Sequence, residues 1–585
     1  MLKQTDTATP AHYHKVVNCQ YACPAHTPVP EYIRLVAERR YTDAYMVNWE
    51  SNVFPGVLGR VCDRPCEPAC RRTRVEETPV AICRLKRVAA DNKGDISERL
   101  PVIPTQKNGK RIALIGAGPA SLTVARDLQP LGYQVVLFDR EHKAGGMIRS
   151  QIPAFRLPES VLDEETDLVL NMGVETRFGA DVSSLKAVLD EQFDAVFVGT
   201  GAPNGRPLAL PGQNDDSEHI HIGINWLSGV SFGHISKASN KVLVLGGGNT
   251  AMDCCRTARR LGAKQVKVVV RSSFEDMKAS PWEKDDALEE GIEIINHHVP
   301  KEYVVENGKF KGVLFERVES VYEDGRRRLV PTKDAPVLIE CDEVLVAIGQ
   351  DASFPWIEKD LGVDFDEWGM PVLNETTLQS SLPQLFFGGD AALGPKNIIT
   401  AVAHGRRAAI SIDLYCQDLG VEARLESGYS LISQKMGVHE WSYHSQVSND
   451  PRQAMPHLSK RKSLNNLKAE VELGFDDDLA LKEAMRCLNC DAQTVFAHER
   501  CIECGACEDI CPMDCINFTG NNDELALRQQ LRVPANNLDE DLYVSADLKT
   551  GQIMVKDEDV CLHCGLCAER CPTGAWDMQT FILNL

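Results

Sequence analysis

The stretch RIALIGAGPAS, residues 111–121, decides the fold of the middle of the chain. It is an apolar run that ends in a glycine-rich turn, and the helical pattern LTVARDLQPLG follows it. A second apolar run, YQVVLFDR, then ends in Asp139. Strand, glycine turn, helix and strand in this order predict a βαβ unit that binds a dinucleotide, with the acid placed for a ribose hydroxyl.

The residues of the turn have separate tasks. Gly116 permits the tight bend, and Gly118 lets the backbone approach a pyrophosphate at the positive end of the following helix. Pro119 and Ala120 begin that helix. Ser121 stands where the motif has its third glycine, and because serine is small we still expect the helix to pack closely on the sheet.

A second unit of the same kind starts at residue 241, with KVLVLGGGNTAMDCCRTARRLGAKQVKVVVR. Its second strand ends in Arg271 instead of an acid. A cation at this place favours the 2′-phosphate of NADP over the free ribose hydroxyl of NAD, and we expect Lys264 to assist it. NAD stays an alternative, because Arg271 is otherwise a solvated strand end followed by two serines.

Three further segments complete the middle of the chain: DAVFVGTGA (194–202), EVLVAIGQ (343–350) and QLFFGGDAALGPKNIITAVAHGRRAA (384–409). With the two glycine turns, residues 15–410 resemble the two-nucleotide flavoprotein core of the glutamate synthase small subunit family. That family also includes the amino-terminal part of dihydropyrimidine dehydrogenase and the large subunits of NADPH-dependent ferredoxin oxidoreductases.

The resemblance implies FAD in the first unit and NAD(P)H in the second unit, which is inserted into the first. The implied FAD contacts are Gly116, Gly118, Pro119, Ala120, Asp139, Gly146, Met147, Arg156, Gly389, Asp390, Ile399 and Thr400. The implied nicotinamide-nucleotide contacts are Gly246, Gly248, Asn249 and Thr250, with Lys264, Arg271, Ala347 and Gly349 as further candidates.

The 21 cysteines are concentrated at the two ends of the chain: six lie in 19–83, eleven in 487–571 and four between. The first residues contain no apolar segment that reads as a secretory signal, so we expect a cytoplasmic protein with reduced thiols that bind metal. The adjacent Cys254 and Cys255 lie in a helical pattern, where neighbouring side chains diverge, and are interpreted as packing residues. A redox disulfide in the flavin core is therefore not expected.

The tail contains CIECGACEDICP (501–512) and CLHCGLCAERCP (561–572). Each is the C-x2-C-x2-C-x3-C-P run of two-cluster ferredoxins, in which the fourth cysteine crosses to the other cluster. The pattern predicts one [4Fe–4S] cluster on Cys501, Cys504, Cys507 and Cys571, and a second on Cys561, Cys564, Cys567 and Cys511. Zinc is the alternative metal. Between the runs, LYVSADLKTGQIMVKD predicts a hairpin.

The front has six cysteines, which cannot fill two clusters of four ligands. In the resembled family two clusters occur here, and an additional CxxC precedes the first of these cysteines in a phrase similar to EAxRCLxC. The phrase occurs in this chain as EAMRCLNC, but at 483–490.

We therefore expect a permuted arrangement with four clusters on sixteen cysteines. One front cluster is held by Cys19, Cys70, Cys487 and Cys490, and the other by Cys23, Cys62, Cys66 and Cys83. Relatives with glutamine or glutamate in place of Cys83 make that ligand the least secure. The alternative is a single front cluster, with Cys487 and Cys490 binding another metal or none.

We expect an α/β protein with two Rossmann-like nucleotide-binding domains, an N-terminal helical iron–sulfur domain and a C-terminal α+β ferredoxin-like domain. Its parts are a helical iron–sulfur domain at 1–105, an FAD-binding domain at 106–235 and 340–415, an NAD(P)H-binding domain at 236–339, a linker at 416–486 and an iron–sulfur tail at 487–585. The net charge of −21 argues against nucleic acid and anionic membranes as partners.

These parts predict an NAD(P)H:ferredoxin-type oxidoreductase, a diaphorase subunit whose flavin joins two-electron to one-electron chemistry. We expect its partner to be ferredoxin or other subunits of a complex, such as a 2-oxoacid:ferredoxin oxidoreductase. No acid–base pair or nucleophile is evident, so no catalytic side chain is predicted. The alternatives are a flavin-site reductase of a small molecule, similar to glutamate synthase, and a non-enzymatic iron–sulfur assembly protein.

Overall fold

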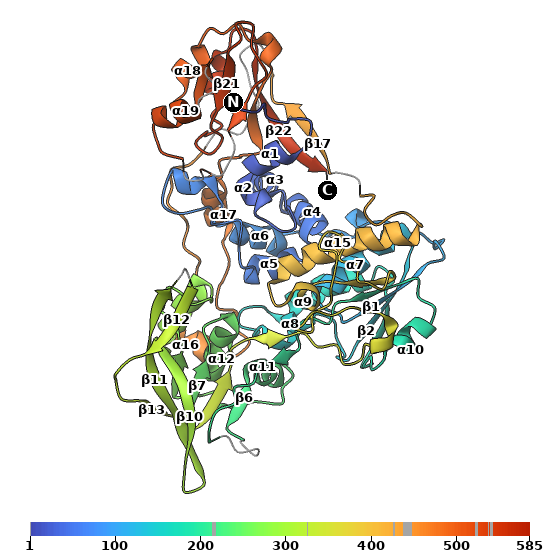
Figure 1. The fold of residues 1–585 in the computed structure, drawn as a ribbon, viewed down its shortest axis with the longest axis vertical. Coiled ribbons are helices and arrows are strands. Elements are labelled where there is room, and N and C mark those ends of the chain that lie inside the picture. The colour runs from blue at the N-terminus through green and yellow to red at the C-terminus, as the bar shows by residue number, and fades with distance from the viewer. Residues whose placement is uncertain are drawn as a thin grey trace.

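The computed structural model describes residues 2–212, 218–323, 326–424, 427–436, 447–520, 524–535, 538 and 542–584. Figure 1 shows the helical front between the carboxyl-terminal iron–sulfur tail at one end and two α/β domains at the other. Over these described ranges, no helix has both the length and the apolar character needed to cross a membrane. The predicted fold class is confirmed.

The first α/β domain is built on a parallel sheet with strand order β16-β4-β1-β2-β3. Its strands are β1 (Arg111–Ile115), β2 (Gln134–Asp139), β3 (Glu175–Phe178), β4 (Ala195–Val198) and β16 (Leu385–Phe387). The residues of β4 and β16 are buried throughout, as expected for strands of a parallel sheet that is covered on both faces. Because β16 follows β4 only after a long insertion, the domain is discontinuous.

The insertion carries a second parallel sheet, with strand order β6-β14-β7-β8-β9. Its strands are β6 (Ile220–Ile222), β7 (Lys241–Leu245), β8 (Gln265–Val269), β9 (Glu293–Ile295) and β14 (Glu343–Val346). β14 pairs with both β6 and β7. Residues 220–231 and 343–346 thus belong to the second sheet and its helix, although the sequence pattern assigns them to the FAD-binding domain.

In both sheets the glycine turn lies directly against the backbone that follows a neighbouring strand, β4 in the first sheet and β14 in the second. Gly116 has φ +93°, and a Cβ there would lie 2.6 Å from the carbonyl oxygen of Gly199. Gly246 has φ +140°, and a Cβ there would lie 2.1 Å from the carbonyl oxygen of Ala347. Any side chain at either position would therefore displace the backbone of the crossing segment.

Helices cover both sheets, and short elements connect them. The first domain has α7 (Pro119–Leu128), η3 (Gln129–Leu131), α8 (Met147–Gln151), α9 (Glu159–Leu170), α10 (Leu185–Asp190), η4 (Lys359–Leu361), α14 (Asp390–Leu393) and α15 (Ile398–Cys416). The second has α11 (Gly223–Ser231), α12 (Asn249–Arg260) and α13 (Pro281–Glu289). The antiparallel pair β5 (Asn204–Gly205) and β15 (Gln350–Asp351) crosses between the two domains. An antiparallel sheet of β10 (His298–Glu306), β11 (Lys309–Glu323), β12 (Arg326–Pro331) and β13 (Val337–Glu340) extends the second domain.

The helical front shares one apolar core with the first α/β domain. Its elements are α1 (Ala11–Val16), α2 (Asn18–Tyr21), α3 (Val29–Ala37), α4 (Tyr41–Asn52), α5 (Pro55–Val61), η1 (Arg71–Arg74), α6 (Ile82–Asp91) and η2 (Ser97–Arg99). Glu165 of α9 accepts hydrogen bonds from the amides of Gly56 (2.6 Å) and Val57 (2.9 Å), at the start of α5. Burial raises the pKa of Glu165 to about 7. The front is thus fixed to the first domain by the shared apolar core and by the hydrogen bonds of Glu165 to the start of α5.

The segment expected to be a linker contains regular structure of its own. It has β17 (Gly428–Ser433), α16 (Lys460–Leu464) and α17 (Asp477–Ala484). β17 pairs with the last strand of the chain, and Ser463 of α16 accepts a 2.6 Å hydrogen bond from Arg260 of α12. The segment therefore packs along the second domain and the front on its way to the tail.

The tail contains two small sheets around the ferredoxin-like runs. Its elements are β18 (Ala492–Phe496), η5 (His498–Arg500), α18 (Ala506–Ile510), β19 (Ile516–Thr519), α19 (Glu524–Gln530), β20 (Tyr543–Val544), β21 (Ile553–Lys556), α20 (Leu566–Arg570) and β22 (Trp576–Asn584). β20 and β21 are antiparallel, which confirms the predicted hairpin. The amide of Thr5 donates to the carbonyl oxygen of Val544 (3.0 Å), so the start of the chain lies on the tail (Figure 1).

Candidate cofactor sites

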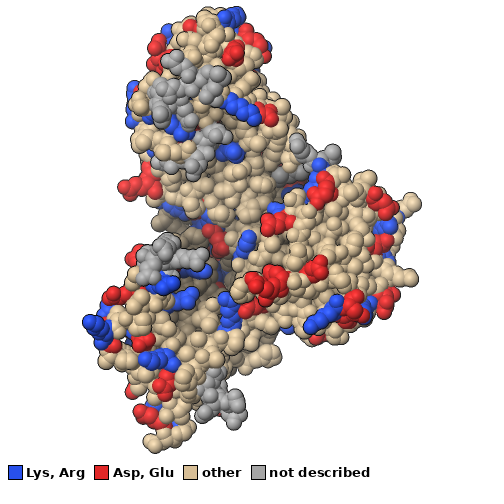
Figure 2. Space-filling view, in the orientation of Figure 1, with Lys and Arg blue, Asp and Glu red and all other residues tan. Residues whose placement is uncertain are grey.

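A cavity of about 670 Å³ lies between the two α/β domains. This volume falls within the usual range of small-molecule sites, about 300–1,000 Å³. Figure 2 shows the surface hollowed between the lobe that carries the second sheet and the rest of the molecule. Both glycine turns reach this cavity, since Gly118 and Gly248 both line it.

The backbone around the cavity suits two dinucleotides. Gly118 and Gly248 are the N-caps of α7 and α12, and neither helix has a side-chain cap, so its first amides are left for a ligand. A Cβ at Gly248 would meet nothing within 4 Å, and one at Gly118 would have only the carbonyl oxygen of Gly199 at 3.8 Å. The polar atoms Thr200 Oγ1 and Gln350 Oε1 belong to residues that line the cavity, and they are buried without a hydrogen-bond partner within the described ranges. The chain therefore fits FAD and a nicotinamide nucleotide here.

Most residues predicted from the glycine motifs lie at this cavity. The residues that line it are Gly116, Gly118, Pro119, Ala120, Asp139, Gly146, Met147, Arg156, Gly389, Asp390, Thr400, Gly248, Asn249, Thr250 and Gly349. The carboxylate of Asp139 accepts from the amides of Ala117 (2.6 Å) and Glu141 (2.8 Å). Burial raises the pKa of Asp390. The two nucleotide-binding units thus converge on one space.

Five predicted residues do not line the cavity. Ile399 is buried at 1% exposure, and Gly246 and Ala347 form the close backbone crossing behind the second turn. Arg271 is exposed just after β8, at the edge of the sheet where the glycine turn lies.

Lys264 directly precedes β8 and lies at the opposite edge of the sheet from Arg271. The prediction that it assists Arg271 is therefore corrected, because about seven residues of extended chain, roughly 23 Å, separate them.

Arg156, an expected FAD contact, is engaged by the second domain. Its guanidinium donates to Asp253 of α12 (2.8 Å) and pairs with Glu283 of α13 at 2.6 Å. These carboxylates raise the pKa of Arg156 against the effect of burial, and burial raises the pKa of Asp253 to about 6. Arg156 thus joins the two nucleotide-binding domains at the wall of the cavity.

Several residues at the cavity were not found by sequence reasoning, among them Asp63, Lys278 and Asn397. Asp63 follows the candidate ligand Cys62, and Asn249 Nδ2 lies 3.5 Å from its carboxylate. The side chain of Asn397 caps α15 by accepting from the amide of Thr400 at 3.0 Å. Asp63 and Lys278 come from segments without a nucleotide motif, whereas Asn397 lies in the segment 384–409 that the sequence pattern includes.

Two cysteines from each end of the chain gather in the front. Cys19 and Cys70 line one small cavity together with Cys487 and Cys490, and apolar residues such as Val29 and Ile82 complete its wall. We call these four cysteines the joining group. Four thiols around one cavity are the donor set that a [4Fe–4S] cluster requires.

Buried charges hold the 483–491 segment on the front. Arg34 of α3 forms a two-pronged bond to Asp491, with distances of 2.6 and 2.5 Å. Arg486 is fully buried and pairs with Glu76 and, at 2.6 Å, with Glu483. Glu483 also accepts from the amide of Ala81 at 2.7 Å. Each buried charge has an opposite partner, as such charges require in a protein interior.

The other four front cysteines, Cys23, Cys62, Cys66 and Cys83, form what we call the front group. All four are buried, and the thiols of Cys62 and Cys66 both interact with that of Cys83. Val61 and Asp63, the neighbours of Cys62, line the dinucleotide cavity. The front group therefore lies next to the cavity wall.

The tail has two more groups, each around a small cavity. The inner tail group is Cys511, Cys561, Cys564 and Cys567, and the outer tail group is Cys501, Cys504, Cys507 and Cys571. Cys515, which has no cluster spacing, also lines the inner cavity, with its sulfur 3.4 Å from that of Cys511.

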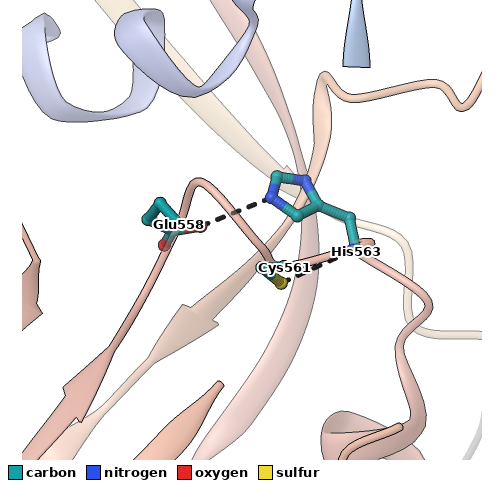
Figure 3. Close-up of side chains that lie close together, drawn as sticks. All are labelled: Glu558, Cys561 and His563. Atoms are coloured by element: carbon teal, nitrogen blue, oxygen red, sulfur yellow. Dashed lines mark hydrogen bonds and ion pairs between the residues drawn. The ribbon is translucent and has the colours of Figure 1, made fainter. Parts of the chain in front are cut away.

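Polar side chains surround the inner tail group on the side of the front. Figure 3 shows Glu558 and His563 beside Cys561, with His563 Nε2 3.4 Å from Glu558 and its amide 3.5 Å from the Cys561 sulfur. Lys556 pairs with Glu558 at 2.7 Å. Arg71 of the front donates to the carbonyl oxygen of Cys561 at 3.0 Å.

Cys254 and Cys255 match the packing role predicted for them. Cys254 and Cys255 are fully buried in the apolar core of the second domain. The described cysteines form no disulfide bond.

Three parts of the chain match known families. Residues 110–405 match the pyridine nucleotide-disulphide oxidoreductases, residues 7–97 match the [4Fe–4S] domain II of dihydropyrimidine dehydrogenase, and residues 500–575 match a 4Fe–4S dicluster domain.

The curated relatives include oxidoreductase subunits. The chain is 33% identical over 527 residues to the NADPH-Fe(3+) oxidoreductase subunit beta of Geobacter sulfurreducens, covering 83% of this chain and 77% of that protein. It is 34% identical to the NADP(+)-dependent formate dehydrogenase subunit beta of Moorella thermoacetica, covering 81% and 70%. It is also 34% identical to the small chain of glutamate synthase [NADPH] of Escherichia coli, covering 67% and 87%.

The resemblance inferred from the motifs is thereby confirmed. The middle part of the chain binds FAD and NAD(P), and its N- and C-terminal domains bind [4Fe–4S] clusters. The chain belongs to the pyridine nucleotide-disulphide oxidoreductase family, as an NAD(P)H-dependent flavoprotein oxidoreductase subunit similar to the small chain of glutamate synthase.

Proposed function

We propose that this chain exchanges electrons between NAD(P)H and a low-potential, ferredoxin-type partner through FAD and four [4Fe–4S] clusters. The gathering of sixteen cysteines into four groups of four carries the proposal. A bound flavin supplies the exchange between two-electron hydride chemistry and one-electron cluster chemistry. The chain holds the two nucleotides against each other and places the cysteine groups beside them.

The contacts support an order for the four clusters. The front group comes first, because the neighbours of Cys62 line the dinucleotide cavity. The joining group comes second, because Cys19 and Cys70 each stand four residues from a cysteine of the front group.

The inner tail group comes third and the outer tail group last. Arg71 follows Cys70 of the joining group, and its guanidinium reaches the backbone of Cys561. Arg74 binds Asp559 in the same loop, so η1 docks on the segment that carries the inner tail group. One cysteine of each tail group, Cys504 and Cys564, is exposed, so a partner can approach the tail; the outer tail group is the proposed exit because it lies last in this order.

The relatives support a partner within a complex. Two are named as beta subunits, one of a formate dehydrogenase and one of an NADPH-Fe(3+) oxidoreductase. We propose that a second subunit, or ferredoxin itself, exchanges electrons at the outer tail group. NADP is the proposed nucleotide, because Arg271 ends the second strand of the second unit.

Anaerobic stopped-flow spectroscopy of the purified chain tests the proposal. Mixing with NADPH, and separately with NADH, should bleach the flavin first and the cluster absorbance afterwards, and the faster nucleotide identifies the physiological one. Clusters that stay oxidised while the flavin is reduced would favour a non-enzymatic role. Turnover of a metabolite without any protein acceptor would favour a reductase that acts directly at the flavin.

A further inference from the structure

Lys86 is a buried cation without a conventional partner. It lies on α6 and is only 4% exposed. Within the described ranges its ammonium group forms neither a hydrogen bond nor an ion pair. Lys556 is buried to a similar degree, but it donates to Thr494 at 2.7 Å and pairs with Glu558 at 2.7 Å.

The thiols of the front group are what face Lys86. Cys83 lies three residues earlier on α6, and residues at this spacing share a helix face. The groups that raise the pKa of Lys86, against the opposing effect of burial, are Cys83, Cys62, Cys23 and Cys66, which together are the whole front group. Lys86 is therefore a buried ammonium on the face of α6 that carries Cys83, and all four thiols of the front group act on it electrostatically.

The other charged side chains near the front group also have partners outside it. Glu67 pairs with Arg452 at 2.7 Å, and Arg84 pairs with Glu472. Arg64 stacks on Trp282 of the second α/β domain, with its guanidinium 3.7 Å from the ring centroid. Arg64 also stands beside the front group, since its amide donates to the Cys62 sulfur at 3.4 Å. Lys86 is the one of these three cations that shares a helix face with a ligand cysteine, Cys83.

An unpaired ammonium in a protein interior is costly unless a negative group offsets it. A cube of iron and sulfide held by four thiolates supplies that negative charge, and each electron added to it makes the charge more negative by one. A fixed neighbouring cation therefore stabilises the reduced form more than the oxidised form, because net charge is one of the determinants of cluster potential.

We propose that Lys86 raises the reduction potential of the front-group cluster, so that the cluster beside the dinucleotide cavity accepts electrons readily. This inference rests on the proposed function, since it requires a cluster on the front group. The step is the transfer of one electron from the reduced flavin to this cluster. No bond in the chain forms or breaks, and the ammonium group keeps its proton.

An anaerobic redox titration of the full holoprotein, followed by electron paramagnetic resonance, tests the role of Lys86. In Lys86→Met one of the four cluster signals should become harder to reduce, by about tenfold in its equilibrium constant, or about 59 mV for one electron. The other three should not move. Lys86→Arg keeps the charge and should titrate as the unmodified protein does. Lys93→Met is the matched control, because Lys93 lies just beyond α6 and pairs with Glu164 at 2.7 Å.

Iron content separates the possible failures. Four unchanged potentials in a Lys86→Met protein with the full iron content would overturn the role of Lys86 and leave the proposed function standing. An unmodified protein with far fewer than about sixteen irons per flavin would overturn the proposed function itself. If Lys86→Met loses about four irons, Lys86→Gln is titrated in its place. Loss of that cluster in both neutral variants but not in Lys86→Arg would support the need for a cation, whereas equal loss in all three would contradict it.

Discussion

The tail and the front of this molecule build the same kind of metal site in different ways. In the tail, two short runs contain all eight cysteines of the inner and outer tail groups, and α18 and α20 pack beside each other. In the front, the joining group takes two cysteines from residues 19–70 and two from 487–490, at opposite ends of the chain. The tail sites are therefore determined by the spacing of cysteines within each short run, whereas the joining group forms only through tertiary structure.

The largest effect is expected from replacing Cys487 and Cys490, the two cysteines that the end of the chain contributes to the joining group. Cys487→Ser combined with Cys490→Ser should lower the iron content from about sixteen to about twelve per flavin, because two ligands cannot hold a cube. Chemical iron analysis against flavin absorbance measures the loss. Cys416→Ser is the control, since Cys416 belongs to none of the four groups, and it should keep all the iron. Equal iron in both variants would show that the joining group binds no cluster.

The next largest effect is expected from the buried ion pair between Arg34 and Asp491, which holds the 483–491 segment on the front. Arg34→Ala leaves Asp491 buried without its cation, which costs about 3–5 kcal/mol and should loosen the 483–491 segment. Hydrogen exchange of this segment should rise. Arg40→Ala is the matched control, because Arg40 pairs with Asp43 while 57% exposed, and solvent screens such a pair so that it contributes little to stability. Similar exchange in both variants would mean that the clamp does not hold the segment.

A smaller effect, on the rate of electron transfer to the tail, is expected from the contact of Arg71 with the backbone of Cys561. Arg71→Met removes hydrogen bonds to Cys561 and Asn18, each worth about 1.5–3 kcal/mol when the donor is charged. Reduction of the tail clusters by NADPH should slow in stopped-flow traces, while reduction of the flavin keeps its rate. If both phases keep their rates, electrons reach the tail by a path that does not depend on this contact.

The smallest expected effect concerns the nucleotide. Arg271→Ala should raise the KM for NADPH by about tenfold and leave that for NADH unchanged, because loss of a charge-assisted hydrogen bond at an exposed site weakens binding by about 1.5 kcal/mol, the low end of the usual range. Lys264→Ala, at the far edge of the sheet, should change neither KM. Steady-state kinetics with an artificial acceptor measure both. An effect of Lys264→Ala equal to that of Arg271→Ala would contradict the placement of the two residues.

The same distinction between local pattern and tertiary placement explains what the sequence could predict. The two glycine turns and the tail runs are short motifs whose spacing fixes the backbone, so both parallel sheets and the tail groups follow from them. The extent of the second sheet was not predicted, because β6 and β14 join it only through pairing over a long separation. Lys264 was misjudged because distance along the chain does not show which edge of a sheet a residue occupies.

Other parts of the site carry no local signal at all. Asp63 and Lys278 reach the dinucleotide cavity from segments without a nucleotide motif, and Lys86 reads in sequence as an ordinary helix-surface lysine. Only the packing of α6 against the cysteine loops buries its ammonium group. The joining group was inferred from a displaced phrase, EAMRCLNC, because the front alone has too few cysteines.

An experimental map of the anaerobic holoprotein, with iron located by its anomalous scattering, tests the central claim most directly. We expect four iron cubes, one of them bonded to Cys19 and Cys70 from the start of the chain and to Cys487 and Cys490 from the end. A map in which Cys487 lies beyond bonding distance of the cube that binds Cys19 would contradict it.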